Sequence, residues 1–384
     1  MVGYRAEDFL SAAKEATGLS DFGESDEFLT GLRLLCADLS DAPNIDDAAR
    51  TRLTGAISGN LANRLRLVEE RQRLPAVCEE VIDGPVVLIG LPRTGTTALV
   101  DLMAQDPAAR APLHWEVQNL FPPPDRGNWA RDPRIAALQA EFDATADSNP
   151  MVALGLHIFG AMLPEECNAI NGVEFWSPSL GVMAHMPRHA EWLQWSLPSR
   201  PYRGHKWVLQ HLQHHGPAGR WLLKSPFHIH ALPQLLAEYP NAVFVQTHRH
   251  PTALMPSMCG LYSTIRGEGE GDPRRAITGK ELCRVWGTGM QRAMAARQDP
   301  ALNARVVDVS HRSMVEDPMG TLKSVYARLN LDFTPQAEAA ATAWLANPAQ
   351  HMSKVKFTLE QFGLTEDEVI DAFGPYAERF KDYF

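Results

Sequence analysis

The sequence lacks the features of a secreted or membrane-spanning protein. Its five cysteines are odd in number, widely scattered and without a CxxC pair, which is typical of reduced thiols in a cytoplasmic protein. No stretch approaches the ~18 apolar residues that a membrane-spanning helix needs. The first residues, MVGYRAEDFL, lack the basic and apolar regions of a secretion signal. We therefore expect a cytoplasmic protein without a transmembrane segment.

Positive charge is also scarce. The 384 residues include 36 Lys and Arg against 46 Asp and Glu, so the formal net charge is −10, and no long basic tract is present. Proteins that bind nucleic acid normally carry a clear positive excess, so no nucleic-acid partner is expected. Hydrophobic residues at 45% and charged residues at 21% describe an ordinary globular chain, long enough for one large domain with an appendage.

The hydrophobic periodicity changes near Pro85. Before it, segments such as DEFLTGLRLLCADL have apolar residues three or four positions apart, which predicts a helical N-terminal appendage over 1–80. After it come short apolar runs, each followed by a helical pattern: PVVLIGL, RWLLK, AVFVQTH and ARVVDVS. This alternation predicts an α/β fold over 81–384, with a parallel sheet flanked by helices. The long irregular segment at about 110–215 is expected to be an insertion that shapes a substrate site.

The segment VVLIGLPRTGTT at 86–97 is close to a nucleotide-binding phosphate loop without its lysine. In the pattern G-x-x-x-x-G-K-[ST], Gly90 and Gly95 fit, Thr97 takes the hydroxyl position and Thr96 replaces the lysine. Gly95 lets backbone N–H groups approach an anion, and the helix that follows favours negative charge at its N-terminus. Arg93 adds positive charge within the turn. In P-loop kinases that lysine contacts the β- and γ-phosphates, so its absence argues against a triphosphate ligand. A P-loop kinase or other nucleotide-dependent phosphotransferase is therefore kept only as the alternative function.

The PRTGTT turn resembles the 5′-phosphosulfate loop of sulfotransferases that use 3′-phosphoadenosine 5′-phosphosulfate (PAPS). The resemblance covers about 85–330 and implies that the donor's 5′-phosphosulfate is held by Arg93, Thr94, Gly95, Thr96 and Thr97. This donor has no γ-phosphate and needs no metal. The implied reaction is transfer of a sulfuryl group to a hydroxyl or amine of a small-molecule, lipid or glycan acceptor, with adenosine 3′,5′-bisphosphate as the product.

A second motif, FVQTHRHPTALMPS, places Arg249 after a strand and Ser257 eight residues later on a helix. Sulfotransferases hold the 3′-phosphate of the donor with an Arg and a Ser at this spacing, so the resemblance implies the same role here. A guanidinium can fork onto a phosphate, and a hydroxyl adds a further donor. The alternative is a surface ion pair for Arg249 and an incidental Ser257.

The segment WLLKSPFHIH resembles the part of the family that lies beside the reacting sulfate. Lys224 ends a predicted parallel strand, where open α/β sheets bind ligands, and its charge, or that of Arg93, could stabilise the leaving oxygen. Pro226 occupies the usual histidine position, so we assign the catalytic base first to His228, whose imidazole suits proton removal at neutral pH. Glu166 is the second choice, together with Glu165, because some carbohydrate sulfotransferases use a glutamate.

Two further segments have weaker family counterparts. VDVSHRS resembles a strand and loop of the family, and His311 within it is given a structural role. In SKVKFTLEQFGL, Lys354 or Lys356 could lie near the 3′-phosphate, with solvated surface lysines as the alternative. A non-enzymatic protein that retains a degenerate nucleotide site is the alternative to an enzyme.

Clusters of histidine and tryptophan complete the candidates. The histidines of HKWVLQHLQHHGP have no acidic or cysteine ligand at a fixed spacing, so a solvated helix face is favoured over a metal site: His205, His211, His214 and His215. The tryptophans of the insertion are expected in the core or on an apolar acceptor pocket: Trp115, Trp176, Trp192 and Trp195.

Overall fold

The computed structural model describes residues 3–41, 45–347 and 355–384, and the chain divides into two compact units. The first unit comprises residues 1–82, 116–132 and 167–217, and the second comprises 83–115, 133–166 and 218–384. The N-terminal helices therefore share a unit with two parts of the segment that the sequence places in an insertion.

The first unit is helical. Its α-helices are α1 (Ala6–Thr17), α2 (Glu27–Asp41), α3 (Asp47–Arg73), α8 (Cys167–Ile170), α9 (Ser179–Met183), α10 (Pro187–Trp195) and α11 (Arg203–His215). Short 3₁₀ turns lie at η1 (Pro75–Glu79), η2 (Arg126–Arg131) and η4 (Asn171–Glu174). Helix α5 (His114–Gln118) begins in the second unit and ends in the first.

The core of the first unit joins distant parts of the chain. Apolar residues three or four positions apart on α1, α2 and α3 are buried with residues of the 167–217 segment, such as Phe175 and Met186. A buried ion pair adds a polar contact, since Arg64 of α3 lies 3.1 Å from the Glu174 carboxylate and donates to the Val173 carbonyl O. An unpaired charge here would be costly, so this pair fixes how α3 packs against η4.

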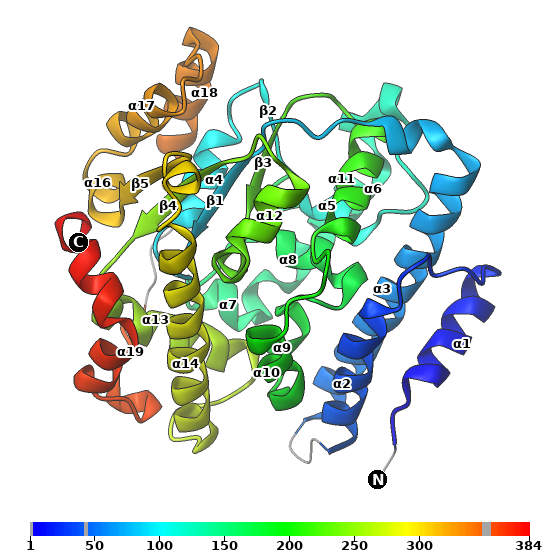
Figure 1. Cartoon of the computed structure of the whole chain (residues 1–384), viewed down its shortest axis with the longest axis horizontal. Helices are drawn as coiled ribbons and strands as arrows, with labels where there is room; N and C mark the ends of the chain where they lie inside the picture. The colour runs from blue at the N-terminus through cyan, green and yellow to red at the C-terminus, as the bar shows by residue number, and fades with distance from the viewer. Residues whose placement is uncertain (1–2, 42–44, 348–354) are drawn as a thin grey trace. The chain divides into compact units, whose positions relative to one another are not determined.

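The second unit contains the predicted parallel sheet, in the strand order β2-β3-β1-β4-β5 (Figure 1). The strands are β1 (Val86–Gly90), β2 (Ala109–Arg110), β3 (Arg220–Lys224), β4 (Val243–His248) and β5 (Val306–Ser310). Strand β1 is buried along its whole length because β3 and β4 flank it, with Val86 opposite Leu222 and Val243. The chain passes from one side of β1 to the other, and such a switch point is where open sheets bind ligands.

Helices separate the successive strands of this sheet along the chain, which confirms the predicted alternation of strands and helices. They are α4 (Thr96–Met103), α6 (Pro133–Thr145), α7 (Pro150–Ala153), α12 (Leu232–Glu238), α13 (Pro251–Ile265), α14 (Arg274–Ala296), α15 (Pro300–Asn303), α16 (His311–Glu316), α17 (Pro318–Arg328), α18 (Pro335–Leu345) and α19 (Glu366–Arg379). The 3₁₀ turns are η3 (Ala146–Ser148), η5 (Pro226–His230), η6 (Glu360–Phe362) and η7 (Lys381–Tyr383). Within the described ranges, no helix combines the length and apolar character needed to cross a membrane.

Candidate active site

The turn between β1 and α4 has a backbone that its sequence dictates. Gly90, Arg93 and Gly95 all have positive φ angles, of 133°, 70° and 92°. A Cβ at Gly90 would come within 2.7 Å of the Thr247 carbonyl O, so glycine is required by space as well as by conformation. Thr94 is fully buried, and its hydroxyl lies 2.6 Å from both the Leu91 carbonyl O and the Thr247 hydroxyl. The turn is thereby fixed to β4.

Helix α4 begins directly after this turn with open backbone donors. Its N-cap is Gly95, which has no side chain to accept from the first-turn N–H groups, and no acidic residue lies in the first turn. The N-cap and first turn thus supply no side-chain anion to the partial positive charge of this helix N-terminus. Thr96 and Thr97 provide hydroxyl groups at the same end.

A cavity of about 980 Å³ opens over the turn, entirely within the second unit. Six of the residues predicted to bind the donor line it: Arg93, Gly95, Thr96, Thr97, Arg249 and Ser257. The seventh, Thr94, is not among the lining residues, because its hydroxyl is used to hold the turn. His311 and Lys356 also line the cavity, whereas Lys354 falls outside the described residues.

Two guanidinium groups meet at this cavity. Arg93 donates from Nε to the Ser257 hydroxyl at 3.1 Å and from Nη1 to the Leu156 carbonyl O at 2.9 Å. Arg249 donates to the Arg93 carbonyl O at 3.3 Å. Burial lowers the pKa of Arg93, and the charge of Arg249 lowers it further. Both side chains remain cationic at neutral pH, since arginine is not deprotonated in proteins.

Little negative charge balances these two cations. In the described part of the chain, no carboxylate forms an ion pair with Arg93 or Arg249. Asp143 is the acidic residue of the cavity lining, and its carboxylate accepts from Gln139. Burial and then Arg249 lower the pKa of His311 to about 4, so this imidazole is neutral at pH 7. The arrangement is suited to an anionic ligand.

Lys224 lies at the C-terminal end of β3, and its side chain is 2% exposed. Its Nζ donates to a Glu166 carboxylate oxygen at 2.6 Å and to the Thr97 hydroxyl at 3.3 Å. Burial alone would lower the pKa of Lys224, but the charge and hydrogen bond of Glu166 raise it. Lys224 therefore contacts two other predicted site residues, Glu166 and Thr97.

His228 lies in η5, four residues after Lys224, and is fully buried. It is not among the residues that line the cavity. Its assignment as the base stays a prediction, and the same holds for Glu166, which differs from it by contacting Lys224.

Three polar residues of this region lie outside the motifs described above and were not predicted from the sequence as site residues. Asp101 is one helical turn after Thr97 on α4, and burial raises its pKa to about 7, although the charge of Lys224 acts in the opposite direction. His157 lines the cavity, and burial followed by the Lys224 charge lowers its pKa to about 4. The i, i+4 spacing from Thr97 could have revealed Asp101, whereas His157 lies in an irregular segment.

His114 is the third of these residues; it is buried and pairs with the half-buried Glu165. Its Nδ1 donates to the Gly160 carbonyl O at 3.0 Å, and its Nε2 faces the Glu165 carboxylate. Burial would lower the pKa of His114, but Glu165 raises it, so the protonated ring is favoured. The same contact lowers the pKa of Glu165 against the effect of its burial. Glu165 is thus held as an anion.

The tryptophans of the insertion divide between core and surface. Trp115 and Trp176 are fully buried, Trp192 is half-buried and Trp195 is 60% exposed. None of the four is among the cavity-lining residues, whose apolar members include Phe142, Phe159 and Phe357 instead.

A parallel sheet with a phosphate-loop-like turn, an uncapped helix N-terminus and two neighbouring arginines defines a class of group-transfer enzymes. The chain belongs to the sulfotransferase family, because the model of that family matches residues 85–335. Among curated proteins, none matches the chain.

Two solved structures are similar over almost the whole chain. Sulfotransferase STF9 from Mycobacterium avium is 27% identical with a TM-score of 0.88, and the match covers 99% of this chain and 97% of that one. Sulfotransferase STF1 from Mycobacterium tuberculosis H37Rv is 29% identical with a TM-score of 0.82, and the match covers 97% of this chain and 99% of that one. The α/β fold with a helical N-terminal part is thereby confirmed, together with the sulfotransferase assignment.

Proposed function

We propose that this sulfotransferase transfers a sulfuryl group from PAPS to a hydroxyl or amine of a small-molecule acceptor, which includes lipids and glycans. The observation that carries the proposal is the pair Arg93 and Arg249 beside the N-terminus of α4, two cations that form no ion pair with a carboxylate of the described residues. Like charges brought together in a partly buried site are unfavourable unless an anion binds between them. PAPS has one anionic group at each end of its ribose.

The two ends of the donor would engage different residues. The 5′-phosphosulfate fits the turn formed by Arg93, Gly95, Thr96 and Thr97, where backbone N–H groups and hydroxyls converge. The 3′-phosphate fits Arg249 and Ser257, which come from the end of β4 and from α13. A metal ion is not required, because the guanidinium groups and the helix supply the positive charge.

The chemical step is an in-line displacement at sulfur. The acceptor oxygen or nitrogen forms the new bond to sulfur while the bond from sulfur to the bridging phosphate oxygen breaks, and the electron pair leaves with adenosine 3′,5′-bisphosphate. Lys224 lies beside Thr97 and would stabilise the charge on the leaving oxygen. The acceptor proton passes to a base, for which His228 and Glu166 are the candidates.

The donor is tested by thermal unfolding of the purified protein, with no metal added to the sample that contains adenosine 3′,5′-bisphosphate. Adenosine 3′,5′-bisphosphate at about 100 times its Kd should stabilise the protein by roughly 2.7 kcal/mol, and ATP with Mg²⁺ should do so much less. Stabilisation by ATP with Mg²⁺ that equals or exceeds that by the bisphosphate would favour the phosphotransferase alternative. Transfer of ³⁵S label from PAPS to a panel of phenols, sterols, lipids and glycans then identifies the acceptor.

A further inference from the structure

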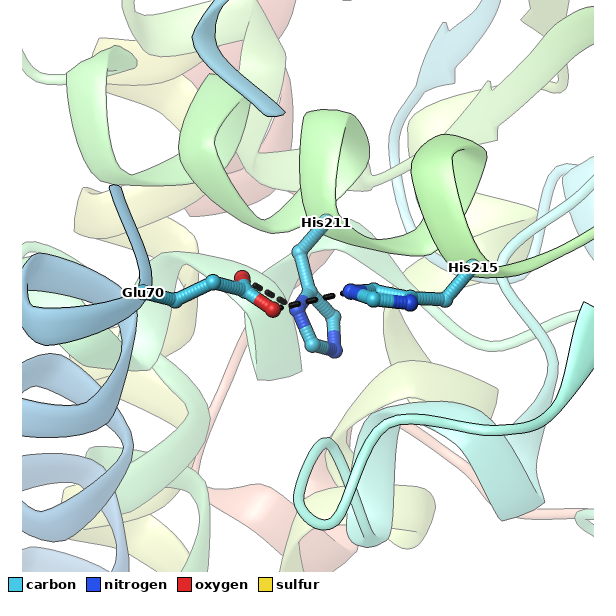
Figure 2. A group of neighbouring side chains, drawn as sticks. All are labelled: Glu70, His211 and His215. Atoms are coloured by element: carbon cyan, nitrogen blue, oxygen red, sulfur yellow. Dashed lines mark hydrogen bonds and ion pairs between the residues drawn. The ribbon is translucent and has the colours of Figure 1, made fainter. Parts of the chain in front are cut away.

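The histidine-rich helix α11 is not the solvated surface that its sequence suggests. His205 and His211 are fully buried, because they lie on the face of α11 that carries Val208, Leu209 and Leu212 into the core of the first unit. His211 and His215 are four residues apart and so lie on one side of the helix. Both turn toward a residue of another helix, Glu70 of α3 (Figure 2).

Glu70 bridges the two rings with its two carboxylate oxygens. His211 Nδ1 lies 2.7 Å from Oε2, and His215 Nε2 lies 2.9 Å from Oε1. One ligand atom from each of the three side chains lies within 4.8 Å of the others. Glu70 and His211 are buried, whereas His215 is 19% exposed and leaves the cluster open on one side.

The second nitrogen of His211 fixes the state of its ring. Its Nε2 lies 2.9 Å from the Leu120 carbonyl O, and a carbonyl can only accept, so Nε2 carries a proton. In the neutral ring Nδ1 is then a bare lone pair, which faces a carboxylate oxygen at 2.7 Å. Two acceptors at that distance repel one another unless a cation, either a proton or a metal ion, lies between them. Histidines that bind metals commonly donate their other N–H to a backbone carbonyl in this way.

The three segments of the first unit meet at this cluster. Glu70 belongs to 1–82, Leu120 to 116–132, and both histidines to 167–217. Glu70 and His211 are separated by 141 residues in the chain, so sequence spacing could not associate them. Phe121 packs on the His211 ring, with 4.7 Å between ring centroids, and shields that side. A metal ion here would link α3 and α11, which are far apart in the sequence.

We propose that Glu70, His211 and His215 bind one Zn²⁺ ion, with a water molecule as fourth ligand on the exposed side of His215. Two imidazoles and a carboxylate are established zinc ligands, and zinc sites of three protein ligands keep a fourth position for water. The ion would join α3 to α11 within the first unit and thereby stabilise the packing of these two helices. It is independent of the cavity and of the sulfuryl transfer proposed above, both of which lie in the second unit.

The proposal is tested on the full-length protein purified without a histidine tag. After dialysis against buffer with excess Zn²⁺ and then against metal-free buffer, mass spectrometry of the metal content should find one zinc per chain. Chelation with EDTA should lower the Tm, and added Zn²⁺ should restore it. Co²⁺ in place of zinc should give the visible absorption of a low-coordinate site.

Matched variants distinguish this cluster from surface histidines. His215→Gln removes a partly exposed ligand and should weaken Zn²⁺ binding by at least about 100-fold, because loss of an outer partner alone costs 10- to 100-fold. The control is His214→Gln on the same turn, where the ring contacts Glu80 at 3.0 Å and zinc binding should be unchanged. A wild-type protein that retains no zinc and whose Tm is insensitive to EDTA would overturn the proposal and leave a protonated His211 as the cation. Equal loss in the two variants would overturn it as well.

Discussion

Replacement of Arg249 by alanine separates recognition of the 3′-phosphate from support of the fold. In the ligand-free protein its guanidinium makes one hydrogen bond to the residues that the structure describes, to the Arg93 carbonyl O at 3.3 Å, and lies near the like charge of Arg93. Arg249→Ala should therefore change the stability of the free protein little. If the proposed donor site is correct, the guanidinium of Arg249 forms a charge-assisted contact with the 3′-phosphate, worth about 1.5–3 kcal/mol.

That free energy corresponds to a roughly 10- to 160-fold loss of affinity for adenosine 3′,5′-bisphosphate. Isothermal titration calorimetry is carried out with this ligand and with adenosine 5′-monophosphate, which lacks the 3′-phosphate. The difference between the two losses of binding free energy is the contribution of the contact between Arg249 and the 3′-phosphate. Arg249→Lys should recover only part of the loss, since an ammonium keeps the charge without the planar fork. Arg312→Ala serves as the control, because Arg312 is exposed and is not among the residues that line the cavity.

The reasoning would be refuted by an equal loss of affinity for both nucleotides in Arg249→Ala. That result would mean that Arg249 shapes the turn through the Arg93 carbonyl and does not contact the phosphate. A large fall in the Tm of the ligand-free variant would lead to the same conclusion.

Three further predictions concern the turn, the buried acid and the base. Gly95→Ala should abolish nucleotide binding and destabilise the protein by about 1–2 kcal/mol in denaturant unfolding, because φ is 92° and a Cβ would lie 3.0 Å from the Met314 methyl. Asp101 has a pKa raised to about 7, so its contribution to stability is complete below about pH 4 and is lost as the pH rises to 7. In the wild-type protein this titration should lower the free energy of unfolding by up to about 4 kcal/mol between about pH 4 and pH 7. Asp101→Asn should abolish this pH dependence, as measured by urea unfolding at each pH. For the base, His228→Ala should lower turnover by roughly 10²- to 10⁴-fold with nucleotide affinity retained, whereas near-normal turnover there and an inactive Glu166→Gln would transfer the role to Glu166.

The sheet was readable from the sequence because most residues of its four longer strands are buried. PVVLIGL is apolar throughout, and RWLLK, AVFVQTH and ARVVDVS each contain a shorter apolar run; the four segments contain the strands β1, β3, β4 and β5 in that order. Strand β2 was missed because it has only two residues, Ala109 and Arg110, at the edge of the sheet. Two residues are too few to show a periodicity.

The candidate site was readable where its residues are contiguous or follow a strand. The turn 93–97 and the Arg249 and Ser257 pair converge on one cavity because parallel strands end at the same edge of the sheet. Two contacts could not be predicted from the sequence: Lys224 with Glu166, and His114 with Glu165. Both glutamates lie in an irregular segment, whose path relative to the sheet has no periodic signal in the sequence. Glu70 was likewise not predicted as a neighbour of the α11 histidines, because it is 141 residues from His211 in the chain.

The interleaving of the two units along the chain decides how this protein can be dissected. The chain leaves or re-enters the first unit at residues 82, 116, 132, 167 and 217, so no single cut separates the units. A fragment limited to the family match at 85–335 would keep Phe175, Leu180 and Met186 but lose α1–α3, whose side chains bury them. Such a fragment should expose a contiguous apolar surface and aggregate on expression. Deletions from the N-terminus thus act as core mutations in this protein, even where they remove residues far outside the family match.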